Sequence, residues 1–268
     1  MPFSGKQEVE GGADLLFGGK KWVFFDLGYT LVRTDREVRL QRTLAELGIM
    51  LERTDIEMAY HLVDKKFMRE APGLLAREIQ EFAPLYNETL LSILVNTQQA
   101  EASEVGVHSL GRFELQWALE TASADDFRGK WTSIPGVPEA LLELRKQGLR
   151  LGLISNWDQS ARSVLAETGL DEFLDPIIIS SEVACQKPDA AIFMLALKQA
   201  GVSPHETLYI GDNYYDDIIG ARGVGIEGLL INPFGRLGIE EIQDCVAYEG
   251  IAQITNMLIL EQEESVYE

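Results

Sequence analysis

Polar residues follow several apolar runs of this sequence, at points where buried β-strands would end. These residues are Asp26, the pair Ser155-Asn156, Lys187 before Pro188, and Asp212 with Asp216 and Asp217. In a parallel sheet the carboxyl ends of the strands meet at one edge, so we expect these side chains to share one space. Carboxylates in such a space can hold a divalent cation, and that cation together with a lysine can neutralise the charge of a phosphoryl group.

Each of these residues also has an ordinary structural explanation. Asp26 could cap a strand end, Ser155 could cap a helix, and Lys187 could lie on the surface. Asp216 and Asp217 could complement the positive end of their helix. The coincidence of all these groups at the ends of successive elements favours a shared site.

The first of these stretches organises the rest of the chain. The aromatic and β-branched run 22–25 predicts a strand that is buried on both faces, as in a parallel sheet. Gly28 then lets the chain turn sharply away from the strand. Asp26 is therefore expected at the carboxyl end of a central strand.

Strands and helices alternate in the second half of the chain. Strands are predicted at 149–154, 177–179, 207–210 and 228–232. The helices between them are predicted at 139–147, after Asp158 as far as Gly169, from Lys187 to Gly201, and from about Tyr215. Repeated βαβ units predict an α/β fold, a Rossmann-like parallel sheet core with helices on both faces.

A helical block separates the first strand from that second half. The sequences Thr34-Asp35-Arg36-Glu37 and Thr54-Asp55-Ile56-Glu57 have the form of capping boxes. They predict helices over about 35–47 and from 54 to Pro72. Residues 74–128 are expected to be helical, including 88–95 and 110–122, with no strand.

These patterns divide the chain into three parts. Residues 1–20 are predicted to be a leader, residues 21–34 and 131–268 the α/β core, and residues 35–130 an all-helical cap inserted after the first strand. The acidic end, 261–268, is expected to be a solvated tail.

The composition excludes several classes of partner. The 268 residues contain 23 Lys and Arg against 43 Asp and Glu, a net charge of −20. Nucleic acid and anionic membranes are therefore poor partners. No apolar run approaches the ~20 residues of a membrane span. Two cysteines are too few for a disulfide framework, and with no secretory signal we expect a cytoplasmic protein.

The order of the motifs resembles that of the haloacid dehalogenase-like hydrolase superfamily. The resemblance covers residues 21–232, and the helical block lies where members with a helical cap carry it. The motifs are Phe25-Asp26-Leu27-Gly28-Tyr29-Thr30-Leu31, Ile154-Ser155-Asn156, Lys187-Pro188-Asp189 and Ile210-Gly211-Asp212 with Asp217.

The resemblance implies a role for each matching residue. Asp26 would be the nucleophile that accepts a phosphoryl group. Ser155 would hydrogen-bond the transferring oxygens beside Asn156, and Lys187 would pair with both the nucleophile and the phosphoryl charge. The implied Mg²⁺ ligands are Asp26, the carbonyl of Gly28, Asp212 and Asp217, the last as a direct or supporting ligand. The implied substrate is a small phosphorylated molecule.

Gly28 departs from the phosphatases of this family, most of which have a second Asp there that serves as general acid and base. Such a group commonly contributes about 10²–10⁴-fold to the rate. The chain could be a phosphatase that tolerates the loss, with Tyr29, which we expect near the substrate, as a poor substitute acid. It could be a 2-haloacid dehalogenase, because halide leaves without a proton. It could also be a catalytically weak relative with a binding or regulatory role.

Overall fold

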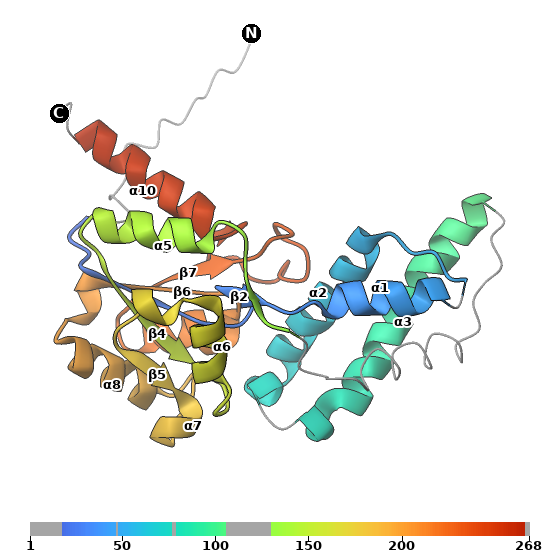
Figure 1. The fold of residues 1–268 in the computed structure, drawn as a ribbon, viewed down its shortest axis with the longest axis horizontal. Coiled ribbons are helices and arrows are strands. Elements are labelled where there is room, and N and C mark those ends of the chain that lie inside the picture. The colour runs from blue at the N-terminus through green and yellow to red at the C-terminus, as the bar shows by residue number, and fades with distance from the viewer. Residues whose placement is uncertain (1–17, 47, 77–78, 106–129, 266–268) are drawn as a thin grey trace, which may run out of the picture.

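The computed structural model describes residues 18–46, 48–76, 79–105 and 130–265. Two lobes are visible in Figure 1: one contains the main sheet, and the other consists of helices inserted after the first strand. The predicted leader lies outside the described part of the chain except for residues 18–20.

The main sheet is parallel, as predicted, and has six strands in the order β5-β4-β1-β6-β7-β8. Their bounds are β1 Trp22–Phe25, β4 Arg150–Ser155, β5 Ile177–Ile179, β6 Thr207–Gly211, β7 Glu227–Ile231 and β8 Ala247–Tyr248. The order places β1 between β4 and β6, which come from distant parts of the sequence. Three strands that each carry a motif are thus neighbours.

Alternating residues of β1 build the two hydrophobic layers of this lobe. Val23 and Phe25 pack on the face covered by α5, α6 and α10, whereas Trp22 and Phe24 pack on the opposite face against α8 and α9. Figure 1 shows α5 and α10 above the sheet and α8 below it. The helix bounds are α5 Val137–Lys146, α6 Ala161–Thr168, α7 Ser180–Val183, α8 Ala190–Ala200, α9 Ile219–Gly223 and α10 Ile251–Ser265. A π-helical turn, Tyr214–Ile218, precedes α9.

The inserted lobe has a hydrophobic core of its own. Helices α1 Arg36–Glu46, α2 Arg53–Glu70 and α3 Ile79–Val105 pack around apolar side chains that include Leu40, Leu44 and Leu90. A two-stranded antiparallel ribbon, β2 Val32–Arg33 with β3 Thr132–Ser133, joins the points where the chain leaves the sheet lobe and returns to it.

Several predicted boundaries were wrong. Thr54 does not cap α2, because the helix already begins at Arg53 and its N-cap, Glu52, makes no side-chain capping bond. The backbone N–H of Arg36 does reach the Thr34 hydroxyl at 3.4 Å, but Glu37 accepts from the Arg36 side chain instead of completing a capping box.

The C-terminal part also differs from prediction. Strand β8 was not predicted, and the first residues of the predicted solvated tail, 261–265, continue the helix α10. The predicted helix at 88–95 lies within α3, whereas the one at 110–122 lies outside the described residues.

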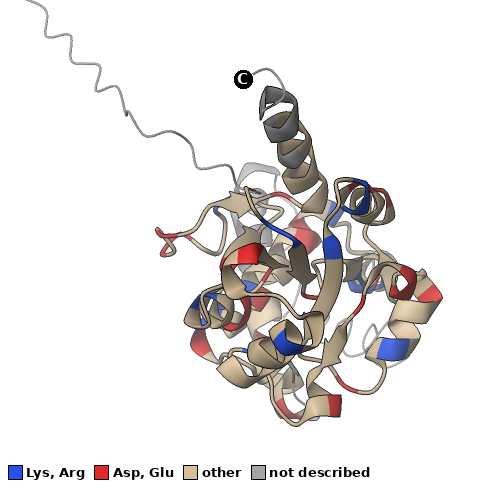
Figure 2. Ribbon diagram, turned by 90° about the vertical axis from the view of Figure 1, so that its left-hand side faces the viewer, with Lys and Arg blue, Asp and Glu red and all other residues tan. Residues whose placement is uncertain are grey.

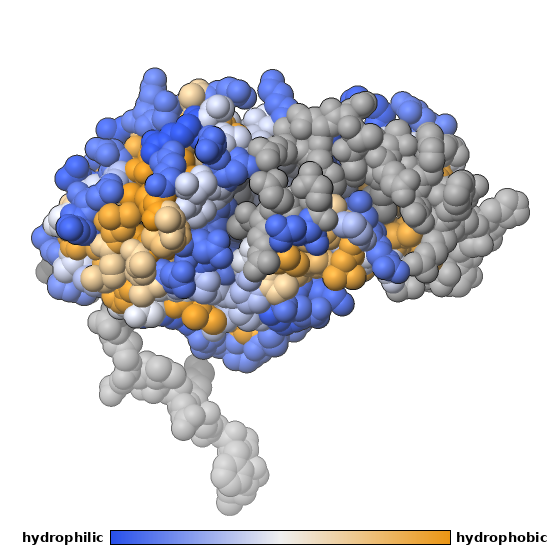
Figure 3. All heavy atoms as spheres, turned by 90° about the horizontal axis from the view of Figure 1, so that it is seen from below, coloured by the Kyte–Doolittle hydropathy of each residue, from blue (hydrophilic) through white to orange (hydrophobic). Residues whose placement is uncertain are grey.

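Charged residues of both signs are present on the described part of the surface. On the face seen in Figure 2, acidic and basic residues are interspersed over the described ribbon. Seen from below in Figure 3, the sheet lobe shows an apolar patch among hydrophilic side chains. Among the described residues, none of the helices combines the length and apolar character that crossing a membrane requires.

His61 connects the two lobes. This residue is buried in α2, with Nε2 2.9 Å from the carbonyl oxygen of Leu237 and its ring against Phe234. Burial, with a smaller contribution from Lys65, lowers the pKa of His61 from 6.5 to about 4. His61 is therefore neutral when the protein is folded at neutral pH.

This shift predicts an acid-dependent loss of stability. The unfolded chain binds a proton at His61 below pH 6.5, whereas the folded chain does not bind it until about pH 4. The contribution of neutral His61 to the free energy of unfolding is therefore fully present above pH 6.5 and is lost as the pH falls toward 4. Between about pH 7 and about pH 5, the stability of the parent relative to His61→Gln should fall by about 2 kcal/mol. Denaturant unfolding of both proteins measures the difference, and a constant difference would contradict it.

Candidate active site

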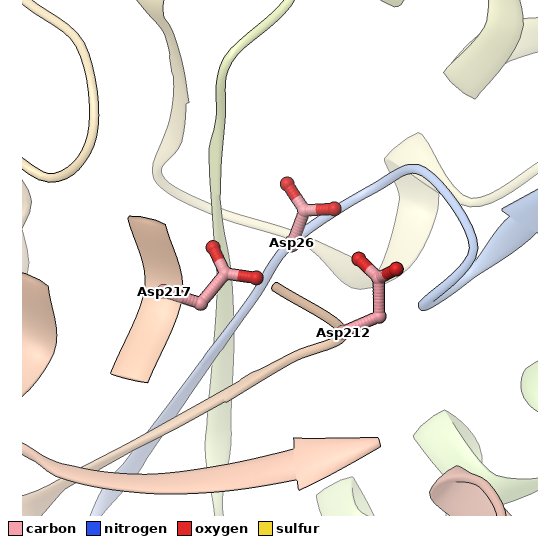
Figure 4. A group of neighbouring side chains, drawn as sticks. All are labelled: Asp26, Asp212 and Asp217. Atoms are coloured by element: carbon pink, nitrogen blue, oxygen red, sulfur yellow. The ribbon is translucent and has the colours of Figure 1, made fainter. Parts of the chain in front are cut away.

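The carboxyl ends of the central strands bring the predicted residues together. Asp26 follows β1, Ser155 ends β4 and Asp212 follows β6, and the backbone N–H of Asp26 continues the ladder to Ile210 at 2.9 Å. Figure 4 shows the carboxylates of Asp26, Asp212 and Asp217 directed toward one another. The expected shared edge is thus present in the fold.

Lys187 lies at the centre of this group and is buried. Its Nζ is 2.7 Å from Asp26 Oδ1, 2.6 Å from Asp217 Oδ1 and 2.9 Å from the Tyr209 hydroxyl. Burial alone would lower the pKa of this ammonium, but the carboxylates of Asp217 and Asp26 raise it well above its usual value. Lys187 is therefore a fixed positive charge beside Asp26.

Tyr209 and Asp217 hold that lysine in place. The Tyr209 hydroxyl donates to the carbonyl of Ile154 at 2.8 Å and so accepts from Lys187 with its free lone pair. Asp217 Oδ2 accepts from the backbone N–H of Asn213 at 3.0 Å. A side chain at Gly211 would overlap with the Asp217 carboxylate, which explains the glycine. Tyr209 was missed because it stands within an apolar strand.

Ser155 and Asn156 approach the same group from β4. The Ser155 hydroxyl donates to Asp26 Oδ1 at 3.1 Å. The Asn156 side chain forms two 2.8 Å hydrogen bonds with the backbone N–H and carbonyl of Lys187. Both residues also line the cavity described below.

Three buried carboxylates can hold a cation here. Asp26, Asp212 and Asp217 each offer one oxygen, and these oxygens lie within 4.8 Å of one another. Burial raises the pKa of Asp26, against the effect of Lys187, and raises that of Asp212 to about 7, against the effect of Lys65. The charged forms are thus costly without a cation, and oxygen ligands suit hard divalent ions.

Lys65 reaches this cluster from the helical lobe, and no sequence pattern predicted it. Its Nζ donates to the backbone carbonyl of Asp212 and lies 3.4 Å from Asp212 Oδ2. The side chain is buried, although lysines of an amphipathic helix such as α2 usually face solvent. The helical lobe therefore contributes a cation to the site.

Asp216 faces the cavity with one unpaired oxygen. Its Oδ2 accepts from the Asn213 side chain at 3.0 Å, whereas Oδ1, which is buried, has no hydrogen-bond partner. Burial, followed by the charge of Asp217, raises the pKa of Asp216 to about 7.

An indole lies beside the position where a side chain at residue 28 would begin. A Cβ atom added at Gly28 would lie 3.3 Å from Trp157 Cζ3. The Trp157 ring packs edge-on against Trp131, with ring centroids 4.6 Å apart, and its Nε1 donates to Ser160 at 3.0 Å. The departure at Gly28 is therefore accompanied by an aromatic side chain in close contact with that position.

A cavity of about 300 Å³ connects these groups with the helical lobe. It is lined on the sheet side by Asp26, Ser155, Asn156, Lys187, Trp157 and Tyr29. On the side of the inserted helices it is lined by residues that include Arg36, Tyr60, Asp64 and Tyr86. This volume is at the lower end of the range of small-molecule sites, about 300–1,000 Å³.

Sequence comparisons find the same family that the order of the motifs resembles. Residues 20–225 match the family model described as haloacid dehalogenase-like hydrolase. Haloacid dehalogenase-like hydrolase domain-containing protein 3 of Xenopus laevis is 36% identical over 103 residues, 38% of this chain, and the chain covers only 42% of that relative. Glyceraldehyde 3-phosphate phosphatase of Pyrococcus furiosus is 35% identical over 215 residues, 77% of this chain and 78% of that enzyme.

Solved structures show the same fold. A haloacid dehalogenase-like phosphatase from Thermococcus onnurineus superposes with a TM-score of 0.53 at 21% identity, covering 89% of this chain and 97% of that one. An L-2-haloacid dehalogenase superposes equally well, with a TM-score of 0.53 at 18% identity and coverages of 90% and 99%. The fold alone therefore does not distinguish the two chemistries.

The position of Lys65 predicts that it competes with a bound cation. Lys65→Met removes a positive charge beside Asp212, so a divalent cation should bind several-fold more tightly and raise the melting temperature more than in the parent. Lys66→Met is the matched control, since Lys66 is exposed on the same helix and pairs with Glu70 at 3.7 Å. Calorimetric titration of the three proteins tests this, and equal affinities would contradict it.

Proposed function

Since this protein belongs to the haloacid dehalogenase-like hydrolases, we propose that it is a Mg²⁺-dependent phosphatase that acts on a small phosphorylated metabolite through an aspartyl-phosphate. One observation carries the proposal: the ammonium of Lys187 lies 2.7 Å from an Asp26 carboxylate that also belongs to a cluster of three buried carboxylates. Phosphoryl transfer needs a nucleophile together with concentrated positive charge, and this arrangement supplies both.

In the proposed reaction Asp26 is the nucleophile. A carboxylate oxygen forms a bond to phosphorus while the bond from phosphorus to the alcohol oxygen breaks, and the electron pair leaves with that oxygen. Lys187 and the Ser155 hydroxyl stabilise the charge on the transferring oxygens. Water then cleaves the aspartyl-phosphate to inorganic phosphate and regenerates the carboxylate. Asn156 fixes the backbone of Lys187 and thus orients the ammonium.

The proposed cation site uses Asp26, Asp212 and the backbone carbonyl of Gly28. Mg²⁺ bound there would neutralise negative charge on the phosphoryl group. Asp217 is assigned a supporting role, because its oxygens already accept from Lys187 and from the backbone N–H of Asn213. It keeps the lysine charged and in place.

A 2-haloacid dehalogenase is the second candidate. The absence of a carboxylate at residue 28 favours it, since a halide leaves without protonation. The three-carboxylate cluster favours the phosphatase, because carbon–halogen cleavage needs no cation. A weak relative with a binding or regulatory role is the third candidate. This third candidate has less support, because Lys187 is hydrogen-bonded to Asp26 as the proposed reaction requires.

Activity assays of the purified protein separate these candidates. We expect phosphate release from phosphomonoesters that is removed by chelator and restored by Mg²⁺, and glyceraldehyde 3-phosphate belongs in the set because relatives are named for it. Asp26→Asn should abolish turnover and leave the fold intact, since an amide cannot attack phosphorus. Chelator-insensitive release of halide from a 2-haloacid would instead establish the dehalogenase. Metal binding without turnover of any substrate would support the third candidate.

Gly28 predicts that the rate depends on the acidity of the leaving group. With no carboxylate at residue 28 the departing oxygen leaves largely unprotonated, so kcat/KM should fall steeply as the leaving-group pKa rises. Gly28→Asp should flatten the dependence and help poor leaving groups most. The new side chain meets Trp157 at 3.3 Å, so the indole must shift by a few tenths of an ångström.

A series of substituted phenyl phosphates measures the slope, with Gly28→Asn as the control of equal size that cannot transfer a proton. The asparagine variant should keep the steep slope. A shallow slope in the parent would contradict the prediction and would show that another side chain donates the proton.

A further inference from the structure

A row of aromatic rings runs from the nucleophile strand into the helical lobe. Trp157 lies over Gly28, Trp131 packs edge-on against Trp157 at 4.6 Å, and Tyr29 packs edge-on against Trp131 at 5.9 Å. All three rings line the same cavity as Asp26. A molecule whose phosphoryl group lies at Asp26 therefore extends along an aromatic wall.

The row ends at an arginine whose charge is already neutralised. The guanidinium of Arg36 lies between the rings of Tyr29 and Tyr60, 4.5 and 4.4 Å from their centroids. Both of its terminal nitrogens contact Asp64, and Tyr86 donates to the same carboxylate at 2.6 Å. Arg36 thus has both faces covered by tyrosine rings and offers no unpaired positive charge.

The charges of the cavity disfavour a second anionic group. Among the described residues that line it, six are acidic and three are basic. Each of the three is ion-paired: Lys187 with Asp26, Arg36 with Asp64, and Arg39 with Asp35 at 3.2 Å. A carboxylate or second phosphate on the leaving group would meet acidic side chains without an available cation. Only the phosphoryl position near Lys187 suits an anion.

We propose that the substrate is the phosphate monoester of a neutral aromatic alcohol, of about one ring in size, whose ring lies against Trp157, Trp131 and Tyr29. The proposal rests on the phosphatase function argued above. Phenolic oxygens are also good leaving groups, so the substrate's chemistry compensates for the glycine at residue 28. On this proposal glyceraldehyde 3-phosphate, with an alkyl leaving group, is a poor substrate.

Binding of inert phosphonates to the Mg²⁺-loaded protein tests the proposal independently of turnover. Phenylphosphonate, butylphosphonate and phosphonoacetate share the phosphonate and differ in an aromatic, an alkyl or a carboxylated substituent. By calorimetry, we expect phenylphosphonate to bind about 2- to 10-fold more tightly than butylphosphonate, as ring contacts provide, and phosphonoacetate to bind most weakly. Trp131→Leu should remove the aryl preference, and Trp131→Phe should keep most of it.

The outcomes distinguish the two proposals. Equal binding of phenylphosphonate and butylphosphonate would overturn the aromatic-substrate proposal while leaving the phosphatase intact. Tight phosphonoacetate binding would overturn it as well. If none of the phosphonates binds, the phosphoryl site itself is wrong. Should Trp131→Leu fail to fold, the ligand series on the parent and on Trp131→Phe still decides.

Discussion

The buried ammonium of Lys187 is the group on which the arrangement of the site depends. A buried charge is tolerated only when it is paired and hydrogen-bonded, and removal of one partner from such a group commonly costs about 3–5 kcal/mol. Here the partners come from three elements: Asp26 after β1, Tyr209 in β6 and Asp217 in the turn before α9. Because these elements meet only in the assembled sheet, the charge can be neutralised only in the native order of strands. The fold and the pairing of Lys187 thus require the same order of strands.

The sequence predicted the parts of this arrangement that follow from local patterns. The apolar run before Asp26 and the alternation of strands and helices were sufficient for a parallel sheet with a helical insertion, because burial on both faces leaves a continuous hydrophobic run. The strands that were not predicted have a different origin. Strand β8 and the β2–β3 ribbon are only two residues long in each strand, so no periodicity marks them, and tertiary pairing alone creates them.

The site residues that the sequence analysis missed share one property: each contacts a residue that is far from it in the sequence. Lys65 meets Asp212 147 residues away, and Trp157 covers Gly28. In the sequence, one is an ordinary helical lysine and the other an ordinary loop aromatic. Their roles are set by the way the helical lobe and the loop after β4 close over the sheet edge. The roles of Asp26, Ser155, Asn156, Lys187 and the cation ligands remain predictions that the geometry supports.

The glycine at residue 28 and the indole of Trp157 are best understood as one feature. A carboxylate at residue 28 would lie against the indole, which must shift by a few tenths of an ångström to admit it, so in this chain residue 28 faces an aromatic surface and bears no acid. An aromatic surface beside the nucleophile favours leaving groups that are themselves aromatic, and such groups depart without a proton. On the proposal made above, the glycine that leaves the site without this acid is thus accompanied by an aromatic surface that favours the substrates which do not need it.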